Sequence, residues 1–241
     1  MTNFTFSFNG KNLDELIKNY ETVNIYGRSL LAEELETVKV LGRDGEVVLN
    51  SQYPSRKIMV EFLIRGLSNR DKLEKLRQLS NYLYSKTDVE IVFGDFPDVY
   101  WFGRVSSFQE PPGDYFQGIG TITILCSDPH PYSGNKESTG FIAANSIFPV
   151  KIERITATIK DAISKLIIKN EKNGQRIILD DDFRAGQVIE ITKDRITKNG
   201  QNILMKLDYI DSEFQNFKCF GGDGISATGA GLKVRYRERL A

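Results

Sequence analysis

The chain has 241 residues, of which 40% are hydrophobic and 27% are charged. This composition is typical of a globular protein with a sizeable core, and it argues against wholesale disorder. Lysine plus arginine and aspartate plus glutamate both number 32, so the net charge is zero. The basic excess that marks a dedicated nucleic-acid-binding protein is therefore absent from the chain as a whole.

The N-terminal residues show no basic region followed by an apolar run, and no stretch of 18 apolar residues occurs anywhere in the chain. We therefore expect neither a secretory signal nor membrane insertion. The two cysteines, Cys126 and Cys219, lie too far apart in the sequence to form a disulfide framework. They fit synthesis in a reducing compartment, and we interpret both as small buried side chains.

A turn-rich stretch followed by a polar one divides the chain. Pro129 and Pro131 interrupt regular structure, and residues 133–140 contain no apolar side chain. We therefore predict two domains, 1–133 and 134–241, with a polar linker at the start of the second. The first domain carries a net charge of −4 and the second a net charge of +4.

Alternating apolar and polar residues predict strands in the first domain. Phe4, Phe6 and Phe8 share one face of such a strand, and the same period recurs over residues 58–64, 89–93 and 121–126. One helix is expected between these strands, with Ser68 as its N-cap and Asp71 completing a capping box. Its predicted buried face consists of Leu73, Leu76, Leu79, Leu83 and Tyr84. This amphipathic helix is expected to cover the sheet.

The second domain shows no helical period of useful length. Asn-Gly pairs at residues 173–174 and 199–200 separate apolar runs, which predicts two hairpins with type I′ turns. Residues 188–192 alternate as a two-sided strand. The prediction is a mainly β protein of two domains. The N-terminal β domain has one covering helix, and the C-terminal domain is an antiparallel β-sandwich.

No group of side chains in the sequence predicts catalysis or metal binding. The single histidine, His130, lies between two prolines and has no nucleophile motif with it. One histidine and two distant cysteines do not supply a zinc site. Asp180, Asp181 and Asp182 offer the oxygen ligands that calcium prefers, but an EF-hand's glycine and glutamate are missing, so we interpret them as a solvated turn. We predict no catalytic residue, no cofactor and no metal.

Three other features have both a functional and a structural interpretation. Asp95 and Asp98 resemble the carboxylate pair of a glycosidase, but Phe-Pro between them indicates a turn. Alternate basic residues from Lys233 to Arg239 form one face of a strand, which could contact phosphates; a solvated or inter-subunit face is the preferred interpretation. Four aromatic residues between Tyr209 and Phe220 could stack on a sugar, but core packing is preferred.

Several short segments are notable for their order and spacing. The most specific is Cys126–Tyr132, at the end of the first domain. The others are Phe6–Gly10, Ile25–Arg28, Gly42–Gly45, Arg56–Phe62, Tyr209–Phe214 and Val234–Arg237. Together these segments resemble the distal tail protein family of long-tailed phages (siphophages) of Gram-positive bacteria. The resemblance covers nearly the whole chain and is denser over residues 1–133.

The resemblance implies a structural virion protein at the phage tail tip, not an enzyme, made in the bacterial host cytoplasm. Family members form a ring, commonly a hexamer, through their N-terminal domain. The ring joins the major tail protein of the tail tube to tail-tip, baseplate and receptor-binding proteins, and DNA passes through its channel without specific binding. The C-terminal domain of the family is a galectin-like or jelly-roll β-sandwich that points outward.

The densest acidic group of the first domain is a candidate for the channel wall of such a ring. It consists of Glu33, Glu34, Glu36, Asp44 and Glu46. These side chains either face the channel, where negative charge would repel the DNA backbone, or solvate an outer surface.

Two alternative functions come from other classes. One is a carbohydrate-binding accessory protein that acts through the C-terminal sandwich, and it requires exposed, coplanar aromatic side chains. The other is a glycan-cleaving enzyme, which requires two carboxylates facing each other across a cleft.

Overall fold

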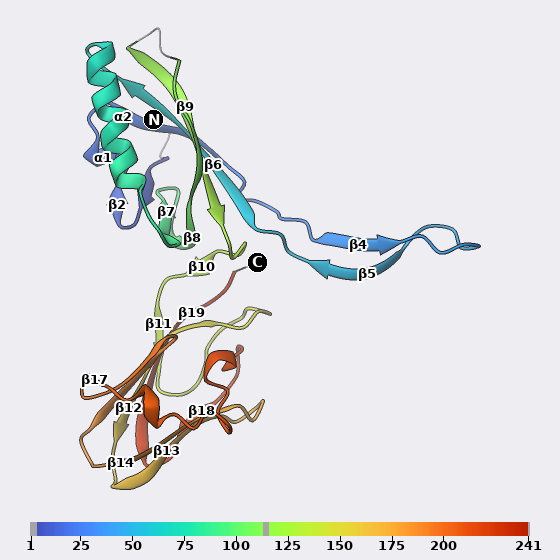
Figure 1. Ribbon diagram of the computed structural model, residues 1–241, viewed down its shortest axis with the longest axis vertical. Helices are drawn as coiled ribbons and strands as arrows, with labels where there is room; N and C mark the ends of the chain where they lie inside the picture. Colours follow the sequence, from blue (N-terminus) through green and yellow to red (C-terminus); the bar gives the residue numbers. More distant parts are fainter. Residues whose placement is uncertain (1–3, 113–115, 241) are drawn as a thin grey trace. The chain divides into compact units, whose positions relative to one another are not determined.

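A computed structural model describes residues 4–112 and 116–240 (Figure 1). The chain forms two compact units, Met1–Pro131 and Tyr132–Ala241. Across the described residues, no helix combines the length and the apolar character needed to cross a membrane. The predicted mainly β fold is confirmed.

The first unit is built around one antiparallel sheet. Its elements are β1 (Phe6–Phe8), β2 (Lys11–Asn12), α1 (Leu13–Leu16), β3 (Tyr20–Tyr26), β4 (Glu34–Val38), β5 (Val47–Gln52), β6 (Arg56–Arg65), α2 (Asn69–Leu83), β7 (Val89–Phe93), β8 (Phe96–Gln109) and β9 (Gln117–Cys126). Hydrogen-bonded neighbours in the main sheet follow the order β2-β1-β7-β8-β9-β6-β3. The strands predicted over residues 58–64, 89–93 and 121–126 are β6, β7 and β9. The strands β4 and β5 pair only with each other.

The predicted helix α2 covers the core of the first unit, but its buried face differs from the predicted one. Ser68 accepts a hydrogen bond from the Asp71 amide, as expected of an N-cap. Leu76, Leu79 and Leu83 are buried, whereas Leu73 and Tyr84 are exposed. In their place Lys72 and Lys75 are buried, because their ammonium groups donate to the carbonyls of Pro112 and Arg65.

The second unit is a sandwich of two antiparallel sheets. Its elements are β10 (Tyr132–Ser133), β11 (Lys136–Ser138), β12 (Lys151–Ile159), β13 (Ile163–Asn170), β14 (Arg176–Phe183), β15 (Val188–Thr192), β16 (Arg195–Lys198), β17 (Gln201–Asn202), the 3-10 turns η1 (Leu204–Lys206) and η2 (Phe214–Asn216), β18 (Ile225–Ala227) and β19 (Ala230–Arg237). One sheet has the order β11-β19-β12-β15-β16-β17 and the other the order β14-β13-β18. Their inner faces share one apolar core.

The polar segment predicted as a linker is not one. Residues 136–138 form β11, which pairs with β19 through Glu137 opposite Arg235. A strand needs no apolar residues when its backbone is paired and its side chains form ion pairs, as Glu137 does with Lys233. The second unit accordingly begins at Tyr132, two residues before the predicted boundary.

The two Asn-Gly pairs form hairpin turns of different kinds. Asn199 and Gly200 both have positive φ, at 50° and 84°, as a type I′ turn requires. At the other pair only Gly174 has positive φ, at 76°, and its amide bonds to the Asn170 carbonyl in a longer loop. The type I′ prediction is therefore wrong for residues 173–174, because a side-chain network described below fixes the longer loop.

Replacing Gly174 by Val is expected to destabilise the second unit by about 1–3 kcal/mol, because a β-branched residue is strained at this φ. A Cβ at Gly174 meets no atom within 4 Å, so the strain is confined to the backbone. Replacement by Asn should restore most of the loss, since Asn tolerates positive φ. Urea unfolding of the two variants measures both effects, and equal stability of the Val and Asn variants would contradict the prediction.

Both cysteines are free and buried, one in each core. Burial raises the pKa of the Cys126 and Cys219 thiols to about 12. Because the thiolate is the nucleophile, this raised pKa suppresses the reactivity of both thiols near neutral pH. We expect a thiol reagent to modify neither residue in the native protein and both in urea. Rapid modification of the native protein would show that a core opens readily.

Candidate assembly surface

The hairpin formed by β4 and β5 is the part of the first unit that lacks a core of its own (Figure 1). Every residue of β4 is exposed, and so is every residue of β5 except the partly exposed Val47. Two-stranded hairpins are at best marginally stable alone in water. Leu35, Val48 and Leu49 are 53–60% exposed, and Leu41 near the tip is fully exposed. This surface is unusually apolar for one that remains in water.

Strand register gives the hairpin two different faces. Leu35 lies opposite Ser51, and Thr37 lies opposite Val48, so these four side chains share one face. We call this the apolar face. A bulge follows Glu36 in the pairing and displaces Leu49.

The opposite face of the hairpin is polar near its base. Glu34 lies opposite Gln52, and Glu36 lies opposite Asn50. We call these four residues the acidic face. The Glu-Leu-Glu alternation at residues 34–36 is the sequence signal that could have revealed this two-sided strand.

The five predicted acidic residues all fall on this hairpin or beside it. Glu33 accepts a hydrogen bond from Ser51, and Glu46 accepts one from Thr37, so these two carboxylates turn toward the apolar face. Asp44 lies in the tip between the strands. Only Glu34 and Glu36 therefore belong to the acidic face.

Two of the other candidate residues of the first unit, His130 and Asp95, have structural partners. His130 is buried, and its ring lies edge-on to Tyr53 at 5.0 Å between centroids. Asp95 receives two hydrogen bonds of 2.7 Å from Arg28, which hold its pKa below the usual range. Asp98 is exposed. The two carboxylates thus do not share one environment.

Two of the three aspartates of β14, Asp180 and Asp181, are paired with lysines. Asp180 lies 3.0 Å from the Lys165 ammonium, and Asp181 contacts both Lys198 and Lys206. Hydrogen bonding to Lys198 lowers the pKa of Asp181. Among the described residues, no three Cys, His, Asp or Glu side chains group closely enough to hold a metal ion.

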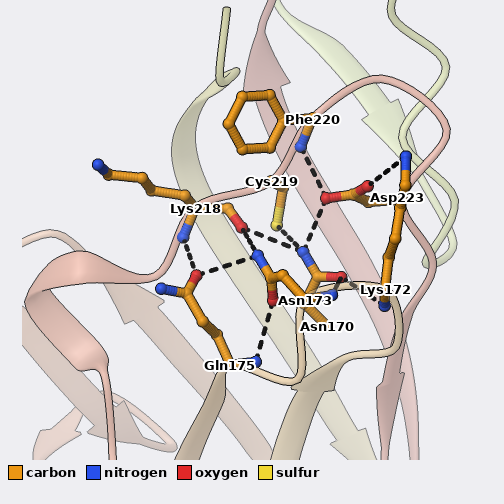
Figure 2. Close-up of polar contacts among 8 residues, drawn as sticks. All are labelled: Asn170, Lys172, Asn173, Gln175, Lys218, Cys219, Phe220 and Asp223. Carbon is orange, nitrogen blue, oxygen red and sulfur yellow. Dashed lines mark hydrogen bonds and ion pairs between the residues drawn. The ribbon is translucent and has the colours of Figure 1, made fainter.

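A buried polar network joins the β13–β14 loop to the loop before β18 (Figure 2). Asn170 is fully buried, and its Nδ2 donates to the Lys218 carbonyl at 3.1 Å and to Asp223 Oδ2 at 2.8 Å. Its Oδ1 accepts from the Lys172 amide. Asp223, also buried, accepts from the Phe220 amide and lies 3.6 Å from the Lys172 ammonium.

Two more amide side chains extend this network (Figure 2). Asn173 accepts from the Gln175 amide and donates to the Lys218 carbonyl, and Gln175 in turn accepts from the Lys218 amide. The amide groups of this loop are therefore engaged with one another. The arrangement locks two loops together and was not predicted, because its members lie some 50 positions apart in the sequence.

Two of the four residues of the predicted basic face pair with glutamates, Lys233 with Glu137 and Arg237 with Glu153. Lys233 and Arg235 are exposed, but Arg237 is buried beside Glu153, which corrects the expected single face. Of the four aromatic residues, Phe214 and Phe217 pack against the core. Tyr209 and Phe220 are 67% and 37% exposed, so core packing holds for only two of the four.

Comparison with known families decides the identity of the chain. Residues 5–126 match the model of the phage tail protein RIFT-related domain, and residues 148–240 match that of the siphovirus-type tail component, C-terminal domain. The chain belongs to the siphophage distal tail protein family. The predicted resemblance is thereby confirmed, and this family member is a structural component of the virion, at the tail tip.

Similar proteins agree with this assignment. The distal tail protein of Bacillus phage SPP1 is 27% identical over 219 residues, which cover 85% of this chain and 83% of that protein. The crystal structure of SPP1 Dit, described as a hub adsorption apparatus in phages that infect Gram-positive bacteria, has a TM-score of 0.76 at 18% identity and covers 99% of both chains. A chain of the phage P2 baseplate, in its activated conformation with calcium, has a TM-score of 0.64 at 10% identity, with 100% of this chain and 99% of that chain covered. The two-domain β fold is therefore shared with tail-tip proteins.

Proposed function

We propose that this distal tail protein forms a hexameric ring that joins the tail tube to the tail-tip proteins, and that it acts as a structural hub without enzymatic activity. Support comes from the family and from the SPP1 and P2 structures, whose descriptions name a hub and a baseplate. The ring contacts the major tail protein on one side and receptor-binding or baseplate proteins on the other. Phage DNA passes through its channel.

The single observation that carries this proposal is the uncovered hairpin. Leu35 and Val48 on its apolar face are 56% and 53% exposed, and they would leave water if the hairpin packed on a neighbouring copy. A contact in which one copy's hairpin lies on a different surface of the next copy is heterologous. Contacts of this kind generate closed rings when the rotation closes.

The acidic face then points away from the neighbour, and we assign it to the channel wall. Glu34 and Glu36 repeat with every copy around the ring, on a unit of net charge −4. A negative wall repels the DNA backbone, whereas a basic wall would bind it through counterion release.

The ring is tested by light scattering coupled to size exclusion, together with negative-stain imaging of the purified protein. We expect a species with six-fold symmetry whose population rises with protein concentration. A strictly monomeric protein at high concentration, with no rings in micrographs, would overturn the proposal.

The channel assignment is tested with a Glu34→Lys, Glu36→Lys variant in a binding assay with double-stranded DNA at low salt. The native ring should not bind, and the variant ring should bind with an affinity that falls steeply as salt rises. The control is Asp180→Lys, Asp182→Lys, which makes the same charge change in the second unit. Equal DNA binding by both variants would remove the channel assignment and leave the ring standing.

A further inference from the structure

The hairpin joins the sheet of the first unit through two short segments, and a partly buried or buried arginine lies within or directly beside each of them. Residues 27–33 lead from β3 into β4, and residues 53–55 lead from β5 into β6. Arg28 lies in the first segment, and Arg56 is the first residue after the second. We call these two segments the root of the hairpin.

Arg56 connects the two segments of the root, because it directly follows the second segment and donates hydrogen bonds to the first. Its side chain is buried, and Nη1 donates to the carbonyls of Gly27 at 2.9 Å and Ser29 at 2.6 Å. Nε donates to the Pro129 carbonyl at 2.6 Å, and the guanidinium lies 4.9 Å from the centre of the Trp101 ring. One planar group thus joins the strand that enters the hairpin, the strand that leaves it and the last loop of the unit. A lysine ammonium lacks the fork and the flat face that make this set of contacts.

Arg28 fixes the entering segment from another side. Its guanidinium forms a two-pronged ion pair with Asp95 in the β7–β8 turn, with both distances 2.7 Å. The same group lies over the rings of Phe93 and Phe96, at 4.8 and 5.9 Å from their centres. A bidentate pair of this kind fixes the orientation of the arginine side chain and also contributes to stability.

Two further contacts leave the root little freedom. Gly27 has a φ of 85°, and a Cβ on it would lie 2.1 Å from the Lys57 carbonyl oxygen. The backbones at Gly27 and Lys57 therefore approach each other more closely than any residue except glycine allows. On the leaving side, Tyr53 packs edge-on against His130. The hairpin itself is uncovered, so its direction is set at these contacts.

We propose that Arg28 and Arg56 are positioning residues that fix the direction in which the hairpin leaves the sheet, so that its apolar face meets the next copy already oriented. The part about the next copy rests on the proposed ring. A fixed hairpin lowers the conformational entropy that is lost on association, and it therefore favours assembly at low concentration.

The direction of the hairpin is tested by pulsed electron paramagnetic resonance. Nitroxide labels at Leu41→Cys, in the hairpin tip, and Arg70→Cys, on α2, report one distance across the root; both side chains are at least 89% exposed. The buried Cys126 and Cys219 stay unlabelled, and labelled protein is diluted with unlabelled protein so that only distances within one chain are seen. We expect a narrow distribution for the parent protein and one at least about twofold wider for Arg56→Lys and for Arg28→Lys.

The matched control is Arg104→Lys. Arg104 also pairs with a carboxylate and a carbonyl in the first unit, those of Asp88 and Lys86, but neither partner belongs to the root. Its variant should keep the parent distribution. If Arg56→Lys does not fold, as thermal unfolding would show, Arg28→Lys decides the question alone. A parent distribution as wide as that of the variants, or root variants no wider than Arg104→Lys, would overturn the proposal.

Assembly provides the second measurement. The concentration at which half the protein is in rings should rise at least about tenfold for Arg56→Lys and stay unchanged for Arg104→Lys. A threshold that stays at the parent value while the distance distribution widens would overturn the link to assembly. The distances themselves do not depend on ring formation, so a failure of the ring proposal is distinguishable from a failure of the positioning proposal.

Discussion

Replacing Leu35 and Val48 by aspartate is expected to abolish assembly while leaving the first unit folded. The two side chains lie together on the apolar face of a hairpin that adds nothing to the core. Their burial against a neighbour contributes about 1–2 kcal/mol each, and two uncompensated carboxylates at the same place cost several more. Association should weaken at least about 1000-fold, as measured by light scattering over a concentration series.

The opposite face of the same hairpin provides the control for this variant. Asn50→Asp with Gln52→Glu also adds two negative charges, at positions on the acidic face. This control should assemble like the parent protein, and thermal unfolding should show the same first transition for all three proteins. If both double variants fail to assemble, general charge repulsion is the cause, and the assignment of the two faces is wrong.

The largest effect on stability is expected at Asn170. Its replacement by Ala removes the hydrogen bonds of Asn170 with the Lys218 carbonyl, with Asp223 and with the Lys172 amide, and Asp223 keeps only the Phe220 amide and Lys172 as partners (Figure 2). A neutral hydrogen bond contributes about 0.5–1.5 kcal/mol and one to a charged group about 1.5–3 kcal/mol, so the second unit should lose roughly 3–5 kcal/mol. Urea unfolding of the whole chain measures it, and Asn135→Ala, at an exposed position, is the control.

A second substitution at the same position tests the charge in the network. Asn170→Asp places a second carboxylate beside Asp223, and repulsion between the like charges raises the pKa of the introduced carboxyl group in the folded state. The folded protein then binds more protons than the unfolded chain, so stability falls as the pH rises above about 4, the unfolded value. The Asp variant should be less stable than the Ala variant at pH 7, and this difference should shrink toward pH 4. A pH-independent difference would contradict the network as described.

Much of the fold follows from local patterns. Period-2 alternation located β6, β7 and β9, because each strand buries one face against a core that only apolar residues fill. The capping pattern at Ser68 located the start of α2. The buried face of the helix was wrong at Leu73 and Tyr84, because lysines whose ammonium groups reach backbone carbonyls can replace leucines at a core boundary.

The candidate assembly surface was harder to predict from the sequence. The acidic group at residues 33–46 was visible as composition, but composition does not show that these residues form a hairpin outside the core. Arg56 donates hydrogen bonds to the carbonyls of Gly27 and Pro129, which are separated from it by 29 and 73 positions in the sequence. Contacts of this range are not visible in a local pattern. The Asn170 network is likewise long-range, and it determined the turn at residues 173–174 against the local Asn-Gly preference.

The side-chain contacts of the two Asn-Gly pairs of the second unit bear on the lifetime of a particle that cannot renew its proteins. Asparagine before glycine is the sequence most prone to deamidation, in which the following backbone nitrogen attacks the side-chain carbonyl carbon. In the second unit that carbonyl is held at both pairs, at Asn173 by the Gln175 amide and at Asn199 by the Val188 amide, each at 2.9 Å. The reaction requires the side chain to rotate out of these bonds. Folding thus protects the two Asn-Gly sites of the second unit against deamidation during the time that the virion spends outside a host cell.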